Sequence, residues 1–329
     1  MAEFRLSSSP PAEPFRAGFS AFGRGDFDEA YRQFAAAAAK DDVRGVVGLG
    51  FLHLTGKGAS HDLAKAAGYL HAAAERNSAL ACAYLGVMYE RGYGFAQDAE
   101  AAAREYQRSL DRGLTSAGAR LALLKLTGRG ANRDVEAAFA LASKGAAQGD
   151  PLAQYVLGAA YSESLGTRQD YAKARENFEK SAAAGFPPAH AALGSLYALG
   201  RGAEQNDEKA LEHFRKAAAA NDAGAKANLG FFYLYGRAVA KDPKEARKLF
   251  EEAYKQGSAV AAFGLGQLFR DGDAVQKNPV QAFAYFDVSA KAGNASAAKA
   301  REEVEKQLSE QELKQARAIA QQYLDEAKR

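Results

Sequence analysis

Several scarcities in the sequence each exclude a class of protein. A single cysteine, Cys82, stands in 329 residues, so an intramolecular disulfide is impossible. No apolar run is long enough to span a bilayer, and we therefore expect no membrane span. Positive charge is in excess by only three: there are 43 Lys and Arg and 40 Asp and Glu. A dedicated nucleic-acid binder usually carries a strong basic excess, so we expect no nucleic-acid partner.

Recognisable chemical motifs are equally scarce. The five histidines never stand at a metal-ligand spacing such as HExxH, and we expect neither a metal nor a cofactor. The N-terminus, MAEFRLSSSPPAEPF, has one arginine and no apolar segment, unlike a signal peptide. For the chain as given this indicates a cytoplasmic protein, and a periplasmic or exported one if a leader has been trimmed.

What the sequence has in abundance is internal repetition. One leucine position recurs every 36 residues without a break, and the neighbouring positions follow in the same register. Seven copies in register predict a repeated structural unit that is stable only when it stacks on its neighbours. The leucines are Leu49, Leu85, Leu121, Leu157, Leu193, Leu229 and Leu265.

Each unit is predicted to contain two helices. In the fifth unit Ala189, Leu193 and Tyr197 share one helical face, and Phe214 lies on the second helix. Residues favoured at helix N-caps precede every second helix: Asp62, Asp98, Asp134, Asp170, Asn206, Asp242 and Asn278. Residues that tolerate the left-handed conformation follow it: Asn77, Gly113, Gly149, Gly185, Asn221, Gly257 and Gly293.

The glycines of the fifth unit have two separate explanations. Gly200 and Gly202 recur in most units, no strand precedes them and no Lys-Ser/Thr follows, so they predict a turn rather than a phosphate loop. Gly194 lies inside the first helix, where glycine costs about 1 kcal/mol relative to alanine. It suggests that the backbone of a neighbouring helix packs against it.

The pattern divides the chain into four parts. Residues 1–13 are predicted to be disordered, and residues 14–43 form a tetratricopeptide-like repeat of 34-residue spacing. Residues 44–293 form the seven 36-residue units, with helix pairs near 45–55 and 62–75 and at each further step. Residues 294–329 form two capping helices, the second opened by Ser309 and Glu312 as a capping box.

The repeated unit resembles the Sel1-like repeat family, a branch of the tetratricopeptide superfamily. The segments ACAYLGVMYERGYGFAQDAEAA (81–102), AHAALGSLYALGRGAEQNDEKA (189–210) and AKANLGFFYLYGRAVAKDPKEA (225–246) carry the resemblance. It implies an all-α, right-handed solenoid of helix-turn-helix repeats that serves as a protein-interaction scaffold. Departures occur in the third unit, with Ala122 for the helix glycine and Lys125 for the tyrosine, and in the seventh, with Ala274 for the second loop glycine.

Three features could indicate chemistry. Ser296 and Lys299 have the S-x-x-K spacing of penicillin-recognising hydrolases, but no Ser-Asp-Asn or Lys-Thr-Gly accompanies them. His190 and His213 occupy variable positions and are expected at the surface. Cys82 borders a core alanine position, which indicates a buried, inert thiol. We therefore predict no catalytic residues and no enzyme.

Residues that pack a repeat must recur, whereas residues that bind a ligand need not. By analogy with tetratricopeptide grooves, three variable positions on each first helix are expected to face the concave side. Asn228, Phe231 and Tyr235 form one such stripe. The candidate partner-binding residues are Tyr84, Arg91, Tyr155, Asn228, Phe231, Tyr235, Gln267 and Arg270.

The sequence thus predicts a non-enzymatic, monomeric scaffold that binds a protein or peptide in its concave groove. Two alternatives stay open, both disfavoured. One is a hydrolase of the penicillin-recognising type. The other is an RNA-binding helical repeat, which reads bases with polar side chains at fixed positions. Val156, Leu123 and Leu199 are apolar at those positions.

Overall fold

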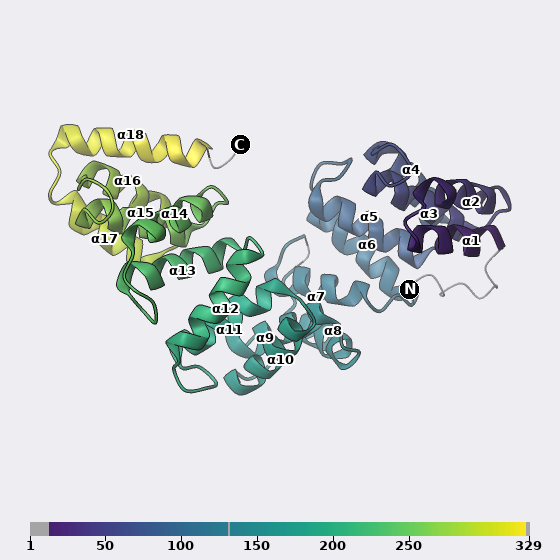
Figure 1. The fold of residues 1–329 in the computed structure, drawn as a ribbon, viewed down its shortest axis with the longest axis horizontal. Helices are drawn as coiled ribbons and strands as arrows, with labels where there is room; N and C mark the ends of the chain where they lie inside the picture. Colours follow the sequence, from purple (N-terminus) through teal and green to yellow (C-terminus); the bar gives the residue numbers. More distant parts are fainter. Residues whose placement is uncertain (1–12, 131, 327–329) are drawn as a thin grey trace. The chain divides into compact units, whose positions relative to one another are not determined.

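The fold is entirely helical. The computed structural model describes residues 13–130 and 132–326, and these form eighteen helices and no strand (Figure 1). The chain is therefore an all-α solenoid of helix pairs, as predicted. The first predicted segment, 1–13, lies outside the described residues except for Glu13, the first residue of α1.

Helices alternate along the chain as first and second members of each pair. An N-terminal pair, α1 (Glu13–Gly23) and α2 (Phe27–Ala39), precedes the seven units, and α17 (Ala295–Glu305) and α18 (Glu310–Glu326) follow them. The first helices are α3 (Val43–Thr55), α5 (Ala79–Arg91), α7 (Ala117–Thr127), α9 (Pro151–Glu163), α11 (Pro187–Leu199), α13 (Ala223–Tyr235) and α15 (Ala259–Asp271). The second helices are α4 (Leu63–Glu75), α6 (Ala99–Asp111), α8 (Val135–Ala147), α10 (Tyr171–Ala183), α12 (Asp207–Ala219), α14 (Pro243–Tyr254) and α16 (Pro279–Lys291).

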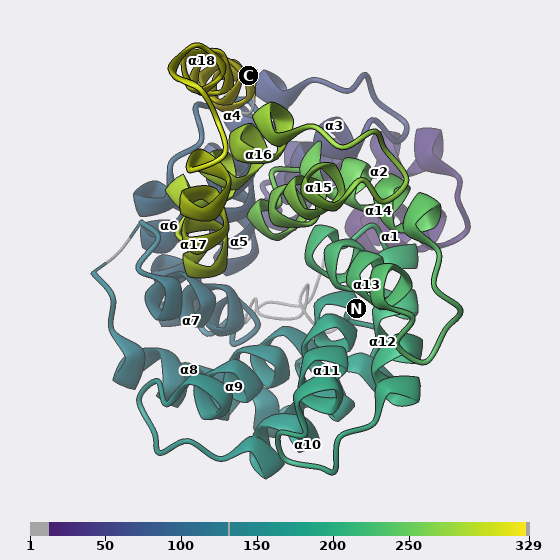
Figure 2. The same cartoon turned by 90° about the vertical axis from the view of Figure 1, so that its left-hand side faces the viewer.

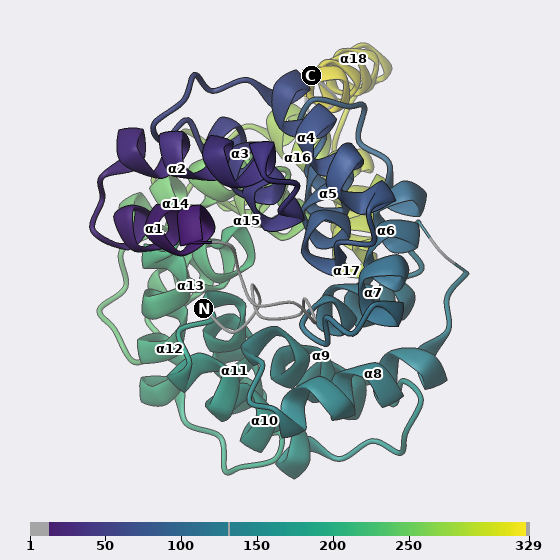
Figure 3. The same ribbon diagram turned by 90° about the vertical axis from the view of Figure 1, so that its right-hand side faces the viewer.

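The helices are grouped in two compact units, one up to Asp170 and one from Tyr171. In the N-terminal unit each helix from α1 to α9 packs on the next (Figure 3). In the C-terminal unit α10 to α17 do the same, and α18 lies against α16 (Figure 2). The boundary between the units falls between the two helices of the fourth repeat.

Helix ends follow the predicted cap positions. Asp62 has an extended backbone, and its side chain accepts a hydrogen bond from the Lys65 amide at 2.9 Å. The same arrangement recurs at Asp98, Asp134, Asn206, Asp242 and Asn278. All seven residues predicted to end a second helix adopt the left-handed conformation, with φ between 64° and 94°. Local residue choice therefore sets the length of the helices.

The glycine inside the first helix faces a ring rather than the backbone of another helix, which corrects the prediction. A Cβ on Gly194 would lie 2.7 Å from two ring carbons of Phe214, on the second helix of the same unit. Phe214 is buried and meets Phe232 of α13 edge to face, with ring centroids 5.5 Å apart. The glycine is thus the socket for a ring that fills the centre of the repeat.

Small residues surround this ring. The alanine position of the second helix has no solvent exposure in any of the seven units, so the helices approach too closely for a longer side chain. The position comprises Ala66, Ala102, Ala138, Ala174, Ala210, Ala246 and Ala282.

Cys82 is likewise fully buried, as predicted, and burial raises the pKa of its thiol.

The C-terminal helices cover the last repeat. Phe283 and Phe286 of α16 are buried against α17 and α18, together with Val304. The Tyr323 ring of α18 stacks on Tyr285 with centroids 4.9 Å apart. α17 and α18 thus cover apolar side chains of the last repeat, as the predicted cap would.

We expect Gly194→Leu to lower the free energy of unfolding by about 1–3 kcal/mol, because the added side chain must displace the Phe214 ring. Chemical denaturation measures the change. Gly68→Leu is the matched control: Gly68 is exposed on α4 and a Cβ there meets nothing within 4 Å. That variant should be as stable as the wild type or more so. If both variants unfold with the same free energy, the Phe214 ring does not depend on the missing Cβ of Gly194.

Deletion of residues 294–329 should expose Phe283 and Phe286 and cause aggregation or a lower melting temperature, since an uncapped repeat presents an apolar face. Size-exclusion chromatography and thermal unfolding test this. Tyr323→Ala, which removes only the ring stack, should have a smaller effect. A truncated protein that is monomeric and melts like the full chain would show that α17 and α18 are a tail.

Candidate functional site

The structure gathers five of the eight predicted residues in the C-terminal unit. Asn228, Phe231 and Tyr235 lie on α13, and Gln267 and Arg270 lie on α15. The two first helices pack together, and the Tyr235 hydroxyl donates a hydrogen bond to Gln267 Oε1 at 2.9 Å. Residues separated by a whole repeat in sequence are thereby neighbours on one surface.

A groove of about 360 Å³ runs over this surface, between α11, α13 and α15. Its floor is made of rings: Phe214, Phe231, Phe232 and Phe263. Its rim carries two large apolar side chains that are mostly exposed, Leu199 at 60% and Tyr235 at 56%. Exposed apolar side chains over an aromatic floor are typical of a surface that binds another molecule.

Phe231 belongs to the floor and also to the packing of the unit. Its ring centroid lies 4.8 Å from that of Phe250 and 6.1 Å from that of Phe263. The Tyr235 ring stacks parallel to it at 6.1 Å. Phe231 is therefore partly a core residue, whereas Tyr235 projects from the surface.

The polar side chains of the groove differ in what they contact. Arg237 is engaged, because its guanidinium pairs with Asp207 and lies 4.5 Å above the Phe232 ring. The half-buried amide of Asn228 makes no hydrogen bond to any part of the chain that the structure describes. The Asn228 amide is thus left to bond a ligand in an apolar groove, whereas the charge of Arg237 is already neutralised by Asp207.

The other three predicted residues lie in the N-terminal unit. Tyr84 is half-buried on α5, with its ring 5.5 Å from that of Phe51, and Arg91 is exposed at the end of the same helix. Tyr155 packs against the core formed by α7, α8 and α9. The eight predicted residues are thus divided between the two units, with five in the C-terminal unit and three in the N-terminal unit.

Sequence reasoning missed Phe263 and Arg237 as groove residues. Phe263 occupies a position that is alanine in four of the six earlier units, among them Ala83 and Ala119. The change from alanine to phenylalanine at this position could have identified Phe263 as a groove residue. Arg237 follows the helix within the loop, where no helical periodicity applies and where Arg201 stands in the preceding unit. No sequence feature sets Arg237 apart.

The S-x-x-K residues lie on the surface of the described structure. Ser296 and Lys299 are both exposed on α17. Within residues 13–130 and 132–326, no cluster of three or more His, Cys, Asp or Glu could hold a metal ion. No described helix is both long and apolar enough to span a membrane.

The two variable histidines are not simple surface residues, contrary to expectation. His190 Nδ1 and His213 Nδ1 lie 2.9 Å apart, and both rings are half-buried between α11 and α12. The Tyr197 ring stacks on His213 with an interplanar angle of 8°. At this distance one Nδ1–H donates to the lone pair of the other Nδ1, which requires that at least one ring is neutral.

Family comparison matches this architecture over most of its length. The Sel1 repeat model matches residues 45–78, 79–114, 116–150, 151–186, 187–222, 223–258 and 259–294. The chain belongs to the Sel1 repeat family. These seven segments coincide with the seven units read from the 36-residue period.

This chain is similar to solved structures of two bacterial proteins. A Sel1 repeat protein from Oxalobacter formigenes is 23% identical, with 74% of this chain and 97% of that chain covered and a TM-score of 0.66. A protective antigen present in uropathogenic Escherichia coli strains, displaying an SLR fold, is 24% identical over 95% of this chain and 84% of that chain, with a TM-score of 0.45. A search of curated proteins found no match. The Sel1 repeat solenoid is consistent with a protein-interaction scaffold.

The histidine pair predicts a loss of stability in acid. Burial and the neighbouring His190 lower the pKa of His213 to about 4, well below the ordinary value, and Lys216 and Lys209 act in the same direction while Glu212 opposes them. The folded state favours the neutral His213 ring. The contribution of this ring to the free energy of unfolding is therefore fully present above about pH 6.5, and it is lost as the pH falls toward 4.

Urea unfolding between pH 7 and pH 4 should show this loss, on the order of 2 kcal/mol for the pair. His213→Leu is the matched variant, since Leu141 and Leu249 occupy the equivalent position in other units. It should remove most of the pH dependence in this range. An unchanged pH profile in His213→Leu would show that other groups cause the loss.

Proposed function

We propose that this chain is a non-enzymatic interaction scaffold, and that the groove between α11, α13 and α15 binds a segment of another polypeptide. The observation that carries the proposal is the combination of an aromatic floor, an exposed apolar rim and one unengaged amide. Such pockets with a few placed polar groups are the usual form of a binding site.

The rim residues favour an apolar anchor on the partner. Leu199 and Tyr235 stand on adjacent first helices, α11 and α13, and border the ring floor. A leucine, methionine or aromatic side chain inserted between them would cover both and lose its own contact with water. Buried anchors of this kind supply most of the binding energy at protein interfaces.

Asn228 favours a polypeptide as the occupant. Its amide offers one acceptor oxygen and a donor NH₂ group, which together match the N–H and C=O of a peptide backbone. A purely apolar ligand would leave this half-buried amide without a partner, at a cost of about 1–3 kcal/mol. A backbone segment satisfies the amide while its side chain occupies the floor.

The charges around the groove favour an uncharged segment. Arg237 pairs with Asp207, and Arg270 pairs with Asp271 at 2.7 Å. No cation or carboxylate among the described residues that line the groove is left to attract an opposite charge. Binding should therefore depend only weakly on ionic strength, in contrast to a charge-steered complex.

Selection from a random peptide library displayed on phage, with the whole chain as bait, tests the proposal. Enriched peptides should share an apolar anchor. Leu199→Ala with Tyr235→Ala should weaken their binding by about tenfold or more, and leave the unfolding midpoint nearly unchanged because both side chains are mostly exposed. Isothermal titration calorimetry measures the affinity.

The control variants are Tyr93→Ala and Val260→Ala, which remove exposed apolar side chains that do not line the groove. Asn228→Val should also weaken binding without unfolding the chain, because Val156 already occupies the equivalent position of another unit. Phe231→Ala is unsuitable as a binding probe, since its packing on Phe250 makes a loss of stability the expected result. Undiminished binding by the Leu199 and Tyr235 double variant would place the site elsewhere.

A further inference from the structure

The histidine pair between α11 and α12 lies beside the floor of the groove. On α12, His213 directly precedes Phe214, whose ring is part of that floor. On α11, His190 stands one helical turn before Gly194, the residue against which the Phe214 ring packs. The helix pair that joins the two histidines therefore also holds one side of the groove floor.

The two imidazole rings point at each other through their Nδ1 atoms. These atoms are 2.9 Å apart and the ring centroids are 5.2 Å apart, so both nitrogens lie near the line that joins the rings. This is the geometry of a hydrogen bond in which one Nδ1–H donates and the other Nδ1 accepts. The bond persists when the pair takes up one proton, because one Nδ1 still has a lone pair. It is lost with a second proton, because both Nδ1 atoms are then donors.

The packing around the rings couples their separation to that of the helices. The Tyr197 ring of α11 lies parallel to that of His213, at an interplanar angle of 8° and a centroid distance of 5.7 Å. Ala210 and Ala217, one turn to either side of His213, have no solvent exposure, so the two helices leave little free space beside the pair. Repulsion between two protonated rings therefore acts on the distance between α11 and α12.

Charged groups of α12 act on both rings. Burial lowers the pKa of His190, and Lys216 acts in the same direction while Glu212 opposes it. Burial and the neighbouring His190 lower the pKa of His213 to about 4, with smaller contributions from the same two α12 residues and from Lys209. The pair therefore takes up its first proton more readily than its second.

Charged groups on the neighbouring helices are held in pairs of their own. Glu179 of α10 accepts a hydrogen bond from the Tyr197 hydroxyl at 3.4 Å and pairs with Arg175 of the same helix. The one charged residue of α13, Lys226, pairs with Glu252 at 2.8 Å. The carboxylates of such pairs also titrate in acid, so variants of the histidines are needed to separate the two effects.

We propose that this histidine pair regulates the groove, an inference that rests on the function proposed above. While the pair carries at most one proton, the Nδ1 hydrogen bond ties α11 to α12 and the Phe214 ring stays against Gly194. With a proton on each ring the helices part, Phe214 leaves its place in the floor, and the groove binds its segment more weakly. A bound segment must in turn oppose the uptake of the second proton, because coupling between two sites is reciprocal.

Calorimetric titration of the whole chain at pH 7 and at pH 4 tests the proposal with a peptide selected as above at pH 7. The peptide is blocked at both ends and contains no Asp, Glu or His, so that only the protein titrates. Its affinity should fall roughly tenfold in acid, an ordinary strength of coupling between two sites. In His213→Leu and in His190→Gln the affinity should change little between the two pH values. Leu249 and Gln154 already occupy the equivalent positions of other units.

The matched control is His61→Gln. His61 is exposed in the N-terminal unit, and Gln97 and Gln205 occupy the equivalent position of other units. This variant removes a titrating imidazole without touching the pair, so its affinity should fall in acid as that of the wild type does.

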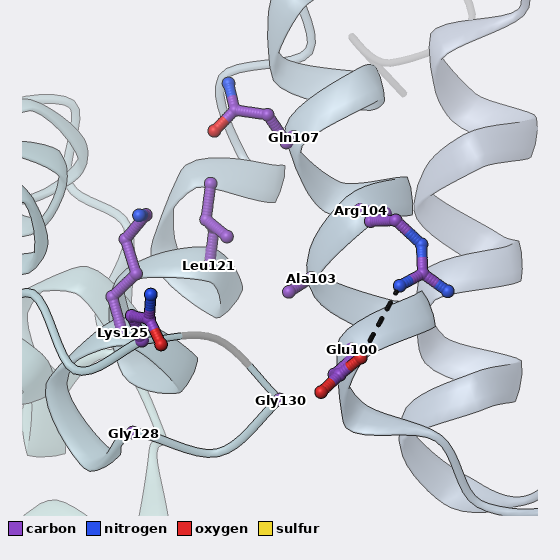
Figure 4. Close-up of a pocket in the computed structure, with 9 residues that line it drawn as sticks. Glu100, Ala103, Arg104, Gln107, Leu121, Lys125, Gly128 and Gly130 are labelled. Atoms are coloured by element: carbon purple, nitrogen blue, oxygen red, sulfur yellow. Dashed lines mark ion pairs between the residues drawn. The ribbon is translucent and has the colours of Figure 1, made fainter.

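Methyl NMR of the peptide-free chain tests the coupling without a ligand. Leu199 is nine residues from His190 on α11, roughly 14 Å along the helix axis, so charge on the pair alone affects its methyl groups little. Their signals should shift as the imidazole signals of the pair titrate, and should not do so in His213→Leu. The reference is Leu121, which lines a hollow between α6 and α7 together with Glu100 and no histidine among its described lining residues (Figure 4). Its signals report the titration of carboxylates and should behave alike in both proteins.

An equal fall in affinity in His213→Leu would overturn the proposal, as would Leu199 methyl signals that stay constant while the pair titrates. If no peptide is selected at pH 7, the proposed function of the groove fails instead. The methyl signals then still decide whether the pair moves the groove wall, so the two failures are distinguishable.

Discussion

The fit of one ring into one glycine is the contact on which the rest of the structure depends. In the fifth unit the Phe214 ring occupies the place where Gly194 has no Cβ, and Tyr106, Phe250 and Phe286 do the same in their units. Alanines with no exposure surround each ring. Because neither partner can change size alone, the spacing of the two helices is fixed in these four units.

That regularity leaves few positions free to differ between repeats, and the groove lies where the repetition breaks. It gathers side chains from variable positions, Leu199, Asn228 and Tyr235, over a floor that is partly common packing. The leucine position of the first helix and the alanine position of the second recur in all seven units, whereas positions on the surface of the first helix differ between units. Binding chemistry can therefore vary from unit to unit while these two core positions stay the same.

The groove offers a ligand apolar surface rather than charge. Its cation is paired, so its affinity would come from burial and from one backbone-matching amide. The histidine pair between α11 and α12 adds a second property, since the helix that carries Leu199 also carries His190. Acid that protonates both rings would strain the same helix pair that forms one wall of the groove.

The sequence by itself determined the helical class, the helix boundaries and the number of repeats. Those properties depend on local chemistry: Asp62 and its counterparts can cap a helix start, Asn77 and Gly113 can turn left-handed, and the leucines recur every 36 residues. The sequence also placed Asn228, Phe231 and Tyr235 on one face. Tertiary structure alone decided that the Phe214 ring packs against Gly194, that His190 meets His213, and that Phe231 belongs partly to the core. Each of these joins residues on different helices, and the distance between helices is set by the packing of all their side chains together, which no local pattern encodes.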